Sequence, residues 1–585
     1  MLYSRLVEAY SELEETTGRL AMIDILVNLF RETPPEVIDK VIYLTQGKLH
    51  PDWMGLPELG LAEKMATKAI AMATGYTSSE VAEDLKEIGD IGAVAEKRLS
   101  QRRIGPIAAP PLTVEMVYDE LDAISRESGP GSSERKIKRL SGLLTKAKPD
   151  EVRYILRIIT GHLRLGVGDM TALDALAVGF ATKKHRPILE RAYNLSSDLG
   201  QIASLLAKKG IDAVRRIRLT PGRPVLMMLA QRLSTAEEIV EKLGGSCSSE
   251  YKLDGERMQV HRMGEKIMIF SRRLENITDM YPDIVGLCRQ HLRTENTIVE
   301  GECVAIDLGT DELRPFQVLM RRRRKYRIKE MMREIPVGMY LFDCLYVDGE
   351  DLTNQPYLVR RARLREIVEE SERFLVTPAL ESGDPNEIMT FFHDAISNGC
   401  EGLIVKSTSP ESIYRAGARS WLWVKLKRSY QSKMIEPVDL AIVGAFMGRG
   451  RRAGTYGALL GAVYDKDTDT FQTICKIGSG WTDEVLASMP SMFKPHKIDH
   501  KHPRVNSILK ADVWFTPSVV TEVIGDEITI SSVHTCALDK IQKGAGLGIR
   551  FPRFTGRWRK DKSPEEATTV QEIIDMYKEQ LKPKR

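Results

Sequence analysis

The stretch EYKLDGERMQVH, residues 250–261, reads as a β-strand that enters a turn. Because side chains alternate along a strand, Lys252 and Asp254 are expected on the same face. Gly255 then lets the backbone bend or come close to a ligand. The pattern fits an ordinary ion pair between Lys252 and Asp254, and it also fits a lysine that forms a covalent bond during a reaction.

A lysine nucleophile must first lose its proton, which nearby cations and removal from water both favour. Arg257 supplies one cation within the same motif. Further along, the otherwise apolar strand IVEGECVAID, residues 298–307, carries Glu300 and Glu302 on one face. Buried carboxylates of this kind usually contact a metal ion, a sugar hydroxyl or a base. The pair therefore predicts a ligand near the lysine.

Short strands further downstream each add charged or aromatic side chains. They are YLFDCLYVDG with Phe342 and Asp343, CEGLIVKS with Glu401 and Lys406, and RSWLWVKLK with Arg419, Lys425 and Lys427. Taken singly, Phe342 fits a core position, Lys406 a snorkelling lysine and Glu401 a surface carboxylate. In series they supply what nucleotidyl transfer requires: a lysine, carboxylates for a divalent metal, an aromatic ring for a purine and cations for phosphates.

Composition and charge narrow the class of protein. A length of 585 residues predicts about three or four domains. The 42% hydrophobic and 28% charged residues, without a long apolar run or a signal peptide, predict a cytoplasmic, nucleoid-associated protein outside the membrane. The seven scattered cysteines form no CxxC pair, which argues against a zinc ribbon and a disulfide framework. The net charge is only +4, but basic runs interleaved with aromatics at 321–329, 448–452 and 550–562 favour nucleic-acid or polyphosphate contact.

The pattern of apolar residues changes twice along the chain. Up to about Ile217, apolar positions recur at helical spacing, and the break LTPGRP follows at 219–224. Short alternating runs then predict an α+β region of antiparallel character, because turns such as residues 263–265 are too short for parallel crossovers. After about Tyr430 the strands suggest a small β-barrel with a charged helical tail.

The ordered motifs KLDGER, SRRLENIT, VEGE, LFDCLYVDG, EGLIVK, WVKLK and RKDK resemble those of the ATP-dependent DNA ligases, most closely the archaeal replicative type, which is similar to the eukaryotic replicative enzyme. LRIITGHLRLGVGDMTALDAL, residues 156–176, resembles the DNA-binding domain of that family. The resemblance implies a multidomain protein with an all-α DNA-binding domain at 1–218, an α+β nucleotidyltransferase (adenylation) domain at 219–429 and a β-barrel OB-fold domain with a C-terminal helix at 430–585.

The resemblance also implies a role for each motif residue. Lys252 would attack the α-phosphate of ATP and form a lysyl–AMP phosphoramidate, and Glu302 and Glu401 would hold Mg²⁺ or another divalent cation such as Mn²⁺. The implied nucleotide-binding residues are Glu250 and Arg257 beside the nucleotide, Arg272 near the phosphates or the nick, Glu302 at the ribose or metal, Phe342 on adenine, Arg419, Lys425 and Lys427 at the phosphates, and Arg559 and Lys562, which with Asp561 orient the pyrophosphate.

The implied substrate is a nick in double-stranded DNA, and the implied processes are replication, repair and recombination. AMP would pass to the 5′-phosphate, and the 3′-hydroxyl would then attack and release AMP. We expect a monomer. The family often carries a sliding-clamp-binding box with paired aromatics, but the corresponding stretch LSQRRIGPIAAPPL, residues 99–112, has none, so clamp binding here would be weaker or made elsewhere. Before R-x-D-K, the run TGRWRKDK holds one residue more than the usual pattern of the family. Arg553 and Arg557 therefore have no fixed counterparts in that pattern, whereas Asp561 and Lys562 do.

Other classes of protein share parts of this pattern. An RNA ligase and an mRNA-capping guanylyltransferase both have K-x-D-G, but the long helical region with GHLRLGVGD favours a DNA ligase. A non-catalytic DNA-binding scaffold would not need Lys252, Glu302, Glu401 and Lys425 together. A P-loop NTPase is excluded because GxxxxGK[ST] is absent, and an NAD-dependent ligase is disfavoured because a four-cysteine zinc module is absent.

Overall fold

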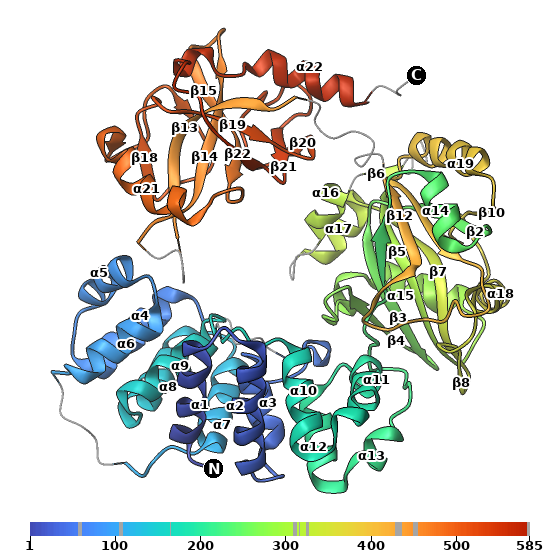
Figure 1. Ribbon diagram of the computed structural model, residues 1–585, viewed down its shortest axis with the longest axis horizontal. Coiled ribbons are helices and arrows are strands. Elements are labelled where there is room, and N and C mark those ends of the chain that lie inside the picture. The colour runs from blue at the N-terminus through green and yellow to red at the C-terminus, as the bar shows by residue number, and fades with distance from the viewer. Residues whose placement is uncertain are drawn as a thin grey trace. The chain divides into compact units, whose positions relative to one another are not determined.

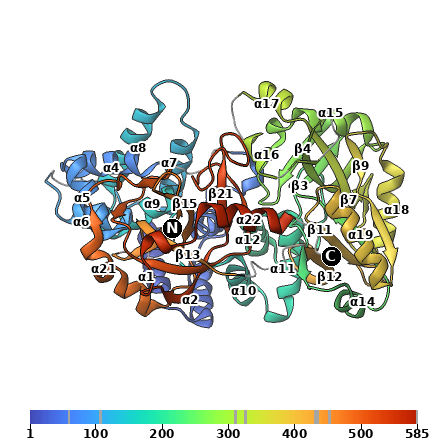
Figure 2. The same cartoon turned by 90° about the horizontal axis from the view of Figure 1, so that it is seen from above.

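A computed structural model describes residues 1–56, 61–103, 109–163, 165–307, 313–314, 316–322, 327–427, 436–448 and 454–581 (Figures 1 and 2). The chain divides into two compact units, one formed by 1–81 and 91–427 and the other by 82–90 and 428–585. Within the described ranges, no helix is long and apolar enough to cross a membrane. All seven cysteines are buried and unpaired, as their scattered positions predict.

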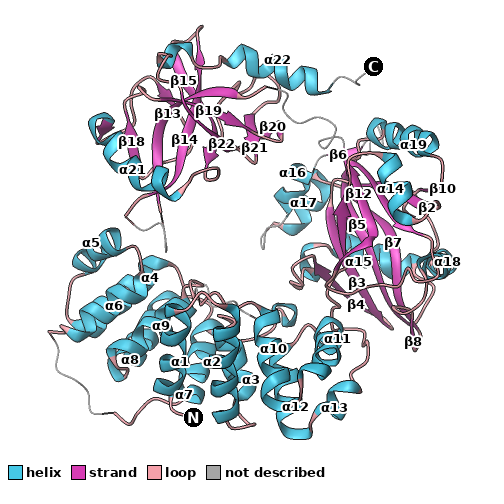
Figure 3. Ribbon diagram, viewed as in Figure 1, coloured by secondary structure: helices cyan, strands magenta, loops and turns pink. Residues whose placement is uncertain are grey.

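The N-terminal part of the chain is helical, as its apolar spacing predicts (Figure 3). Helix α9 (Pro149–Ile159) shows why: proline opens it, and the Glu151 carboxylate accepts the backbone N–H of Lys148 at 2.8 Å. Its buried face repeats at helical spacing. The other helices are α1 (Tyr3–Glu15), α2 (Arg19–Glu32), α3 (Ile38–Thr45), α4 (Glu63–Thr74), α5 (Ser78–Ile88), α6 (Ile91–Ser100), α7 (Val114–Arg126), α8 (Ser132–Lys146), α10 (Asp169–Phe180), α11 (Arg186–Ser196), α12 (Leu199–Lys209) and α13 (Ile211–Arg215).

The middle of the chain builds two sheets. One has the strand order β1-β12-β11-β2-β10, and the other has the order β4-β3-β5-β7-β8, with β6 on β5 and β9 on β7. The strands are β1 (Leu229–Arg232), β2 (Cys247–Lys252), β3 (Glu256–Met263), β4 (Lys266–Ser271), β5 (Asn296–Ile306), β6 (Leu313–Arg314), β7 (Val337–Val347), β8 (Glu350–Asp351), β9 (Phe374–Val376), β10 (Ala379–Ser382), β11 (Gly402–Ser407) and β12 (Arg419–Lys427). Most neighbours are antiparallel, as expected, but β1 and β12 and also β7 and β9 run parallel.

Helices cover these sheets. Buried apolar residues of α14 (Ala236–Leu243) and α19 (Pro385–Ser397) form one core with β2, β11 and β12. Residues of α15 (Pro282–His291) and α18 (Tyr357–Ile367) form a second core with β3, β5 and β7. Two short helices, α16 (Phe316–Leu319) and α17 (Ile328–Glu334), follow β6. Figure 1 shows α14 and α19 on the same sheet.

The turn between β2 and β3 joins the two sheets and thereby places Lys252 at their junction. Gly255 makes this turn possible, because a Cβ at that position would lie 2.3 Å from the carbonyl oxygen of Cys303 and 2.9 Å from Cγ of Glu302. Cβ atoms essentially never make contacts shorter than 3.0 Å, so a side chain at this position would push the turn away from β5. The glycine of K-x-D-G therefore brings the lysine strand against the strand of Glu302.

The second unit contains a strongly curled sheet. One edge of β13 (Val438–Met447) pairs with β14 (Tyr456–Asp465), whereas its other edge pairs first with β19 (Val520–Ile524) and then with β18 (Val513–Phe515). A strand that changes partner in this way turns the corner of a barrel-like sheet. The remaining elements are β15 (Thr470–Ile477), β16 (Lys497–Ile498), β17 (Val505–Asn506), β20 (Glu527–Ser531), β21 (Gly546–Arg550), β22 (Arg553–Trp558), α21 (Asp483–Phe493) and α22 (Val570–Leu581).

The order of a helical domain, a two-sheet domain and a curled-sheet domain confirms the predicted fold class. The predicted boundary at 429/430 lies outside the described residues. So do Ile104 in the predicted clamp-binding stretch and, in the basic runs, residues 323–326 and 449–452.

Candidate active site

Lys252 ends β2, and strand pairing determines its neighbours. Gly402 of β11 is paired with Lys252 on one side and with Lys427 of β12 on the other, which places the preceding Glu401 between the two lysines. Both ammonium groups lie 2.5 Å from the same carboxylate oxygen, Oε2 of Glu401. The Lys252 and Glu401 side chains are 22% and 18% exposed, so the pair is open to a ligand on one side.

This arrangement keeps Lys252 protonated. Burial lowers the pKa of Lys252, but the attraction of Glu401 and Glu302 outweighs burial and raises that pKa above its ordinary value. Arg257, the cation that the motif supplies, donates a 2.8 Å hydrogen bond to Glu300. A reaction at Lys252 therefore has to remove the proton and separate the amine from Glu401.

Three carboxyl groups approach Lys252. Burial raises the pKa of Glu302 to about 7, despite the attraction of Lys252 and Arg257. Burial and the neighbouring Glu401 also raise the pKa of Asp254. Glu401 differs from the other two: burial raises its pKa, but Lys252 and Lys427 reverse the effect and lower it to about 2. Carboxylates this close together repel one another, and the ammonium groups of Lys252 and Lys427 offset that repulsion. Such a cluster favours the binding of positive charge.

The carboxylates have the chemistry that Mg²⁺ prefers, but they do not enclose an ion by themselves. Among the described residues, no group of three or more His, Cys, Asp and Glu side chains has the arrangement of a metal site. Mg²⁺ is commonly held by one or two carboxylates together with substrate phosphates and water. Glu302 and Glu401 have the ligand chemistry of such a partial set.

Glu300, on the same strand, has a different role from Glu302. It is fully buried and accepts hydrogen bonds from Arg257 (2.8 Å), Gln259 (3.0 Å) and Tyr414 (2.9 Å). These three donors satisfy its charge inside the protein. Glu300 therefore positions Arg257 and has no need of the ligand that its place beside Glu302 predicts.

The aromatic part of the site is formed by Phe342 and Trp423. Their rings meet edge to face, with centroids 6.1 Å apart. The Arg257 guanidinium lies over both rings, 5.2 Å from the centroid of Phe342 and 5.5 Å from that of Trp423. Phe342 is only partly buried, whereas Trp423 is buried. Phe342 thus has the exposure that a base-stacking ring needs, with Trp423 supporting it from the side.

Glu250 is more enclosed than the sequence predicts. Its carboxylate is buried and is surrounded by Tyr357 (2.5 Å), Arg361 (2.6 Å) and Lys406 (2.6 Å). Tyr357 and Arg361 come from α18, more than a hundred residues away in sequence, so no motif spacing could have indicated them. Lys406 also donates to the carbonyl of Phe342 at 3.0 Å and thereby joins Glu250 to the aromatic pair.

The remaining cations gather around β12. Lys425 has its pKa lowered first by burial and then by Lys427, Arg419, Lys252 and Arg272. So many cations within electrostatic reach repel one another unless an anion binds between them. The structure therefore brings together the cations that the motifs predicted for phosphates in this part of the chain.

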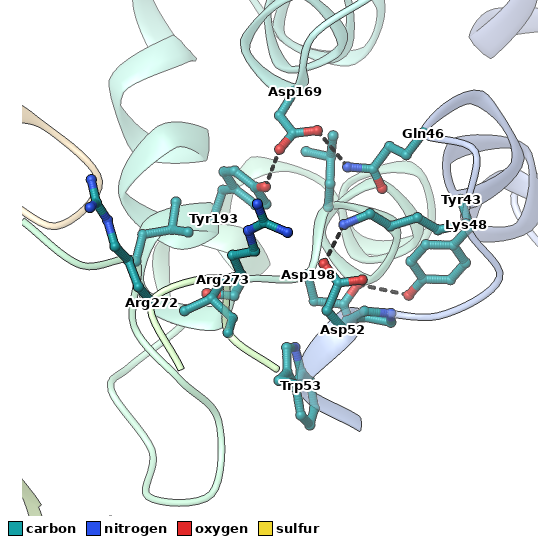
Figure 4. Close-up of a pocket in the computed structure, with 15 residues that line it drawn as sticks. Tyr43, Gln46, Lys48, Asp52, Trp53, Asp169, Tyr193, Asp198, Arg272 and Arg273 are labelled. Atoms are coloured by element: carbon teal, nitrogen blue, oxygen red, sulfur yellow. Dashed lines mark hydrogen bonds and ion pairs between the residues drawn. The ribbon is translucent and has the colours of Figure 1, made fainter. Parts of the chain in front are cut away.

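Arg272 and Arg273 directly follow β4 and border a cavity of about 230 Å³. Residues of the helical part of the chain line most of the rest of it, including Lys48, Asp169 and Asp198. Figure 4 shows Arg273 pointing among these acidic side chains while Arg272 extends away from them. The sequence motif predicts a role for Arg272 and not for Arg273, but nothing in the RR pair distinguishes the two arginines.

Arg559, Asp561 and Lys562 lie in the second unit, just after β22. Arg559 Nη1 donates to Asp439 Oδ2 at 2.7 Å, and its Nη2 donates to Asp561 Oδ2 at 2.8 Å. Lys562 Nζ lies 2.6 Å from the same oxygen of Asp439. Arg559 lowers the pKa of the Asp561 carboxyl to about 2. Sequence reasoning missed Asp439, which is more than a hundred residues away in VDLAIVG.

Comparison with known proteins identifies relatives along nearly the whole chain. Residues 2–177 match the family model described as "DNA ligase N terminus", 227–427 match "ATP dependent DNA ligase domain" and 452–562 match "ATP dependent DNA ligase C terminal region". "DNA ligase 2" of Thermofilum pendens is 55% identical over 99% of this chain and 98% of its own length. "DNA ligase" of Staphylothermus marinus is 51% identical over 100% and 99%. The solved structure "Pmar-Lig_PreS3" shares the fold, with a TM-score of 0.53 and 16% identity over 95% of this chain and 99% of its own.

Proposed function

This chain belongs to the ATP-dependent DNA ligases, and on that premise we propose how its residues seal a nick in duplex DNA. Membership makes it an enzyme that uses ATP and acts on DNA through an adenylated intermediate. The observation that supports the assignment of residues is the open Lys252–Glu401 pair beside the buried Glu302 and the cations of β12.

In the first step, Nζ of Lys252 attacks the α-phosphorus of ATP. A nitrogen–phosphorus bond forms, the bond to the pyrophosphate oxygen breaks, and the lysine proton is released. An oxygen of the 5′-phosphate at the nick then displaces Lys252 and takes the AMP. Finally the 3′-hydroxyl attacks that 5′-phosphate, loses its proton, and expels AMP as the phosphodiester forms. In such phosphoryl transfers the protein mainly positions groups and stabilises charge.

The nucleotide would lie between the aromatic and cationic parts of the site. Phe342 stacks on adenine, and Arg257, held over that ring by Glu300, contacts the nucleotide. Glu250 reaches the nucleotide only at its edge or shapes the pocket from behind, because Tyr357, Arg361 and Lys406 surround it. Arg272, Arg419, Lys425 and Lys427 neutralise phosphate charge.

Glu302 and Glu401 would hold the divalent cation, Mg²⁺ or Mn²⁺, and Glu302 also reaches the ribose. When bound, the ion neutralises charge on the phosphates. For Glu401 to take that role, its Oε2 atom has to exchange the ammonium group of Lys252 for another partner. The same exchange frees the Lys252 amine from the carboxylate that keeps it protonated.

In the second unit, Arg559 and Lys562 would orient the pyrophosphate during self-adenylation, with Asp561 fixing the guanidinium. We assign residues 1–218 to DNA binding, 219–429 to adenylation and 430–585 to the OB-fold domain. The enzyme would act as a monomer at the cytoplasmic nucleoid, in replication, repair and recombination. A sliding clamp would bind it weakly through residues 99–112, or elsewhere.

The experiment is incubation with α-labelled ATP, GTP or NAD in separate tubes, followed by denaturing gels and by addition of either nicked duplex DNA or nicked RNA. We expect a covalent adenylate from ATP alone and its loss on addition of nicked DNA, with a sealed strand as product. A guanylate from GTP would indicate a capping enzyme, and transfer only to nicked RNA would indicate an RNA ligase. Either result would overturn the proposed function.

A further inference from the structure

Asp439, near the start of β13, is the common partner of the two cations in the R-x-D-K motif. Its Oδ2 atom accepts a hydrogen bond from Arg559 Nη1 at 2.7 Å and lies 2.6 Å from Lys562 Nζ. Two cationic groups that approach one atom would repel each other without the carboxylate between them. Asp439 is therefore what keeps the two side chains together.

The backbone of Asp439 is held as firmly as its side chain. Its N–H donates to Oγ1 of Thr568 at 2.9 Å, and its carbonyl accepts the N–H of Thr568 at 2.9 Å. The side chain of Asp439 is only 10% exposed, whereas those of Arg559 and Lys562 are 22% and 32% exposed. The carboxylate is thus a fixed inner anchor, and the two cations keep an outer face toward solvent.

The remaining contacts complete the anchor. Asp561 accepts from Nε and Nη2 of Arg559 at 3.1 and 2.8 Å, which leaves Nη1 for Asp439. The other oxygen of Asp439, Oδ1, is buried and has no hydrogen-bond partner among the described residues. A carboxylate kept only for stability would be expected to use both oxygens. Asp439 instead contacts both cations through Oδ2 and leaves Oδ1 without a hydrogen bond among the described residues.

We propose that Asp439 is a positioning residue for self-adenylation, which holds Arg559 and Lys562 at the spacing that receives the pyrophosphate of ATP. This rests on the proposed role of Arg559 and Lys562. Asp439 does not itself touch the nucleotide, since its carboxylate would repel phosphate. It acts through the two cations, whose exposed faces bind the leaving group while their inner faces stay on Asp439.

Two assays on the full-length enzyme distinguish a positioning role of Asp439 in self-adenylation from a role in maintaining the fold. The first measures the rate of enzyme–AMP formation from α-labelled ATP. The second measures sealing of a nick that already carries AMP on its 5′-phosphate, which does not require pyrophosphate release. For Asp439→Asn we expect the first rate to fall about 10- to 100-fold, since misplacement by about 1 Å can cost a hundredfold. The second rate should stay within about twofold of wild type.

Glu522 provides a matched control. It lies directly opposite Asp439 in the β13–β19 pairing, is similarly buried, and has its cation partner, Arg557, outside the motif, 3.6 Å away. Glu522→Gln should leave both rates within about twofold of wild type. Asp439→Glu keeps the charge and should restore part of the adenylation rate that Asp439→Asn loses.

The possible failures point to different errors. If Arg559→Ala and Lys562→Ala form enzyme–AMP at the wild-type rate, the proposed role of the motif is wrong. If they are slow but Asp439→Asn is not, the inference about Asp439 is overturned. Equal loss in both assays for Asp439→Asn would show that the residue maintains the fold and does not position the cations, which also overturns the inference.

Discussion

Two lysine–glutamate pairs bridge the same two strands with the partners exchanged. In one, Lys252 ends β2 and Glu401 precedes β11, with the side chains 22% and 18% exposed. In the other, Glu250 lies on β2 and Lys406 on β11, with the side chains 3% and 1% exposed. Attraction by Glu401 raises the pKa of Lys252, whereas burial lowers the pKa of Lys406 despite Glu250.

The difference shows how a structural ion pair can be told from a reactive one. Glu250 has a tyrosine, an arginine and a lysine around it, so the protein alone satisfies its charge. Glu401 has two ammonium groups on one oxygen and two further carboxyl groups nearby. The protein itself satisfies the enclosed pair, and we propose that the open pair exchanges partners when ATP and a divalent cation bind.

The largest expected effect is on the open pair. Lys252→Ala removes the nucleophile and should reduce enzyme–AMP formation at least about a thousandfold, because no other group supplies the bond to phosphorus. Lys406→Met should still form an adduct, at a reduced rate. The measurement is labelled adduct on a denaturing gel. An adduct of normal yield on the Lys252→Ala enzyme would show that another residue is the nucleophile and that the open pair is not the reactive one.

Loss of the enclosed Glu250–Lys406 pair should lower the free energy of unfolding more than loss of a partner in the open pair. Lys406→Met leaves the buried charge of Glu250 with two partners in place of three, and we expect a loss of about 3 kcal/mol in the free energy of unfolding. Lys427→Met removes a partner of Glu401 in the open pair and should cost less than about 1 kcal/mol. Urea denaturation of both variants measures this. Equal losses would mean that enclosure does not distinguish the pairs.

His261 extends the comparison to pH. Its Nδ1 accepts the N–H of Gly222 at 2.9 Å, its Nε2 lies 2.9 Å from Gln259 Oε1, and burial lowers its pKa to about 3. Between about pH 6.5 and 3 the unfolded chain binds this proton and the folded protein does not, so stability should fall as pH decreases. The slope from this group is at most about 1.4 kcal/mol per pH unit.

Melting temperatures of the wild type and of His261→Gln, measured from pH 7 to pH 4.5, test this dependence. The variant removes the titrating group and should lose less stability over that interval than the wild type does. Parallel curves for the two proteins would show that His261 titrates alike in the folded and unfolded states.

The smallest effect concerns the cations beside the open pair. Binding of a nicked duplex should weaken steeply with salt, because phosphate contacts release counterions. Lys425→Ala should reduce the slope of log affinity against log salt by about one. Arg363→Ala, which removes a residue paired with Glu366 on the surface of α18, should leave the slope unchanged. A flat salt response of the wild type would contradict phosphate contact altogether.

The sequence indicates neighbouring residues most readily where they share one motif or follow one another along the ordered strands. The motifs name Lys252, Glu401 and Lys427, and the pairing of their strands at Gly402 brings the three side chains together. The partners of Glu250 and Arg559 could not be foreseen, since α18 and β13 reach them only through the tertiary fold. Of the donors to Glu300, Gln259 lies opposite it on the adjacent strand β3, whereas Tyr414 comes from the loop before β12 and reaches it only through the tertiary fold.

The most direct test is to locate the AMP. After incubation of the wild-type enzyme with ATP and Mg²⁺, proteolysis and mass spectrometry of the adenylated peptide would identify the modified lysine. We predict AMP on Lys252 alone, with the peptide that contains Lys406 unmodified. AMP on Lys406, on Lys427 or on a residue outside the two sheets would contradict the assignment of the open pair as the reactive one.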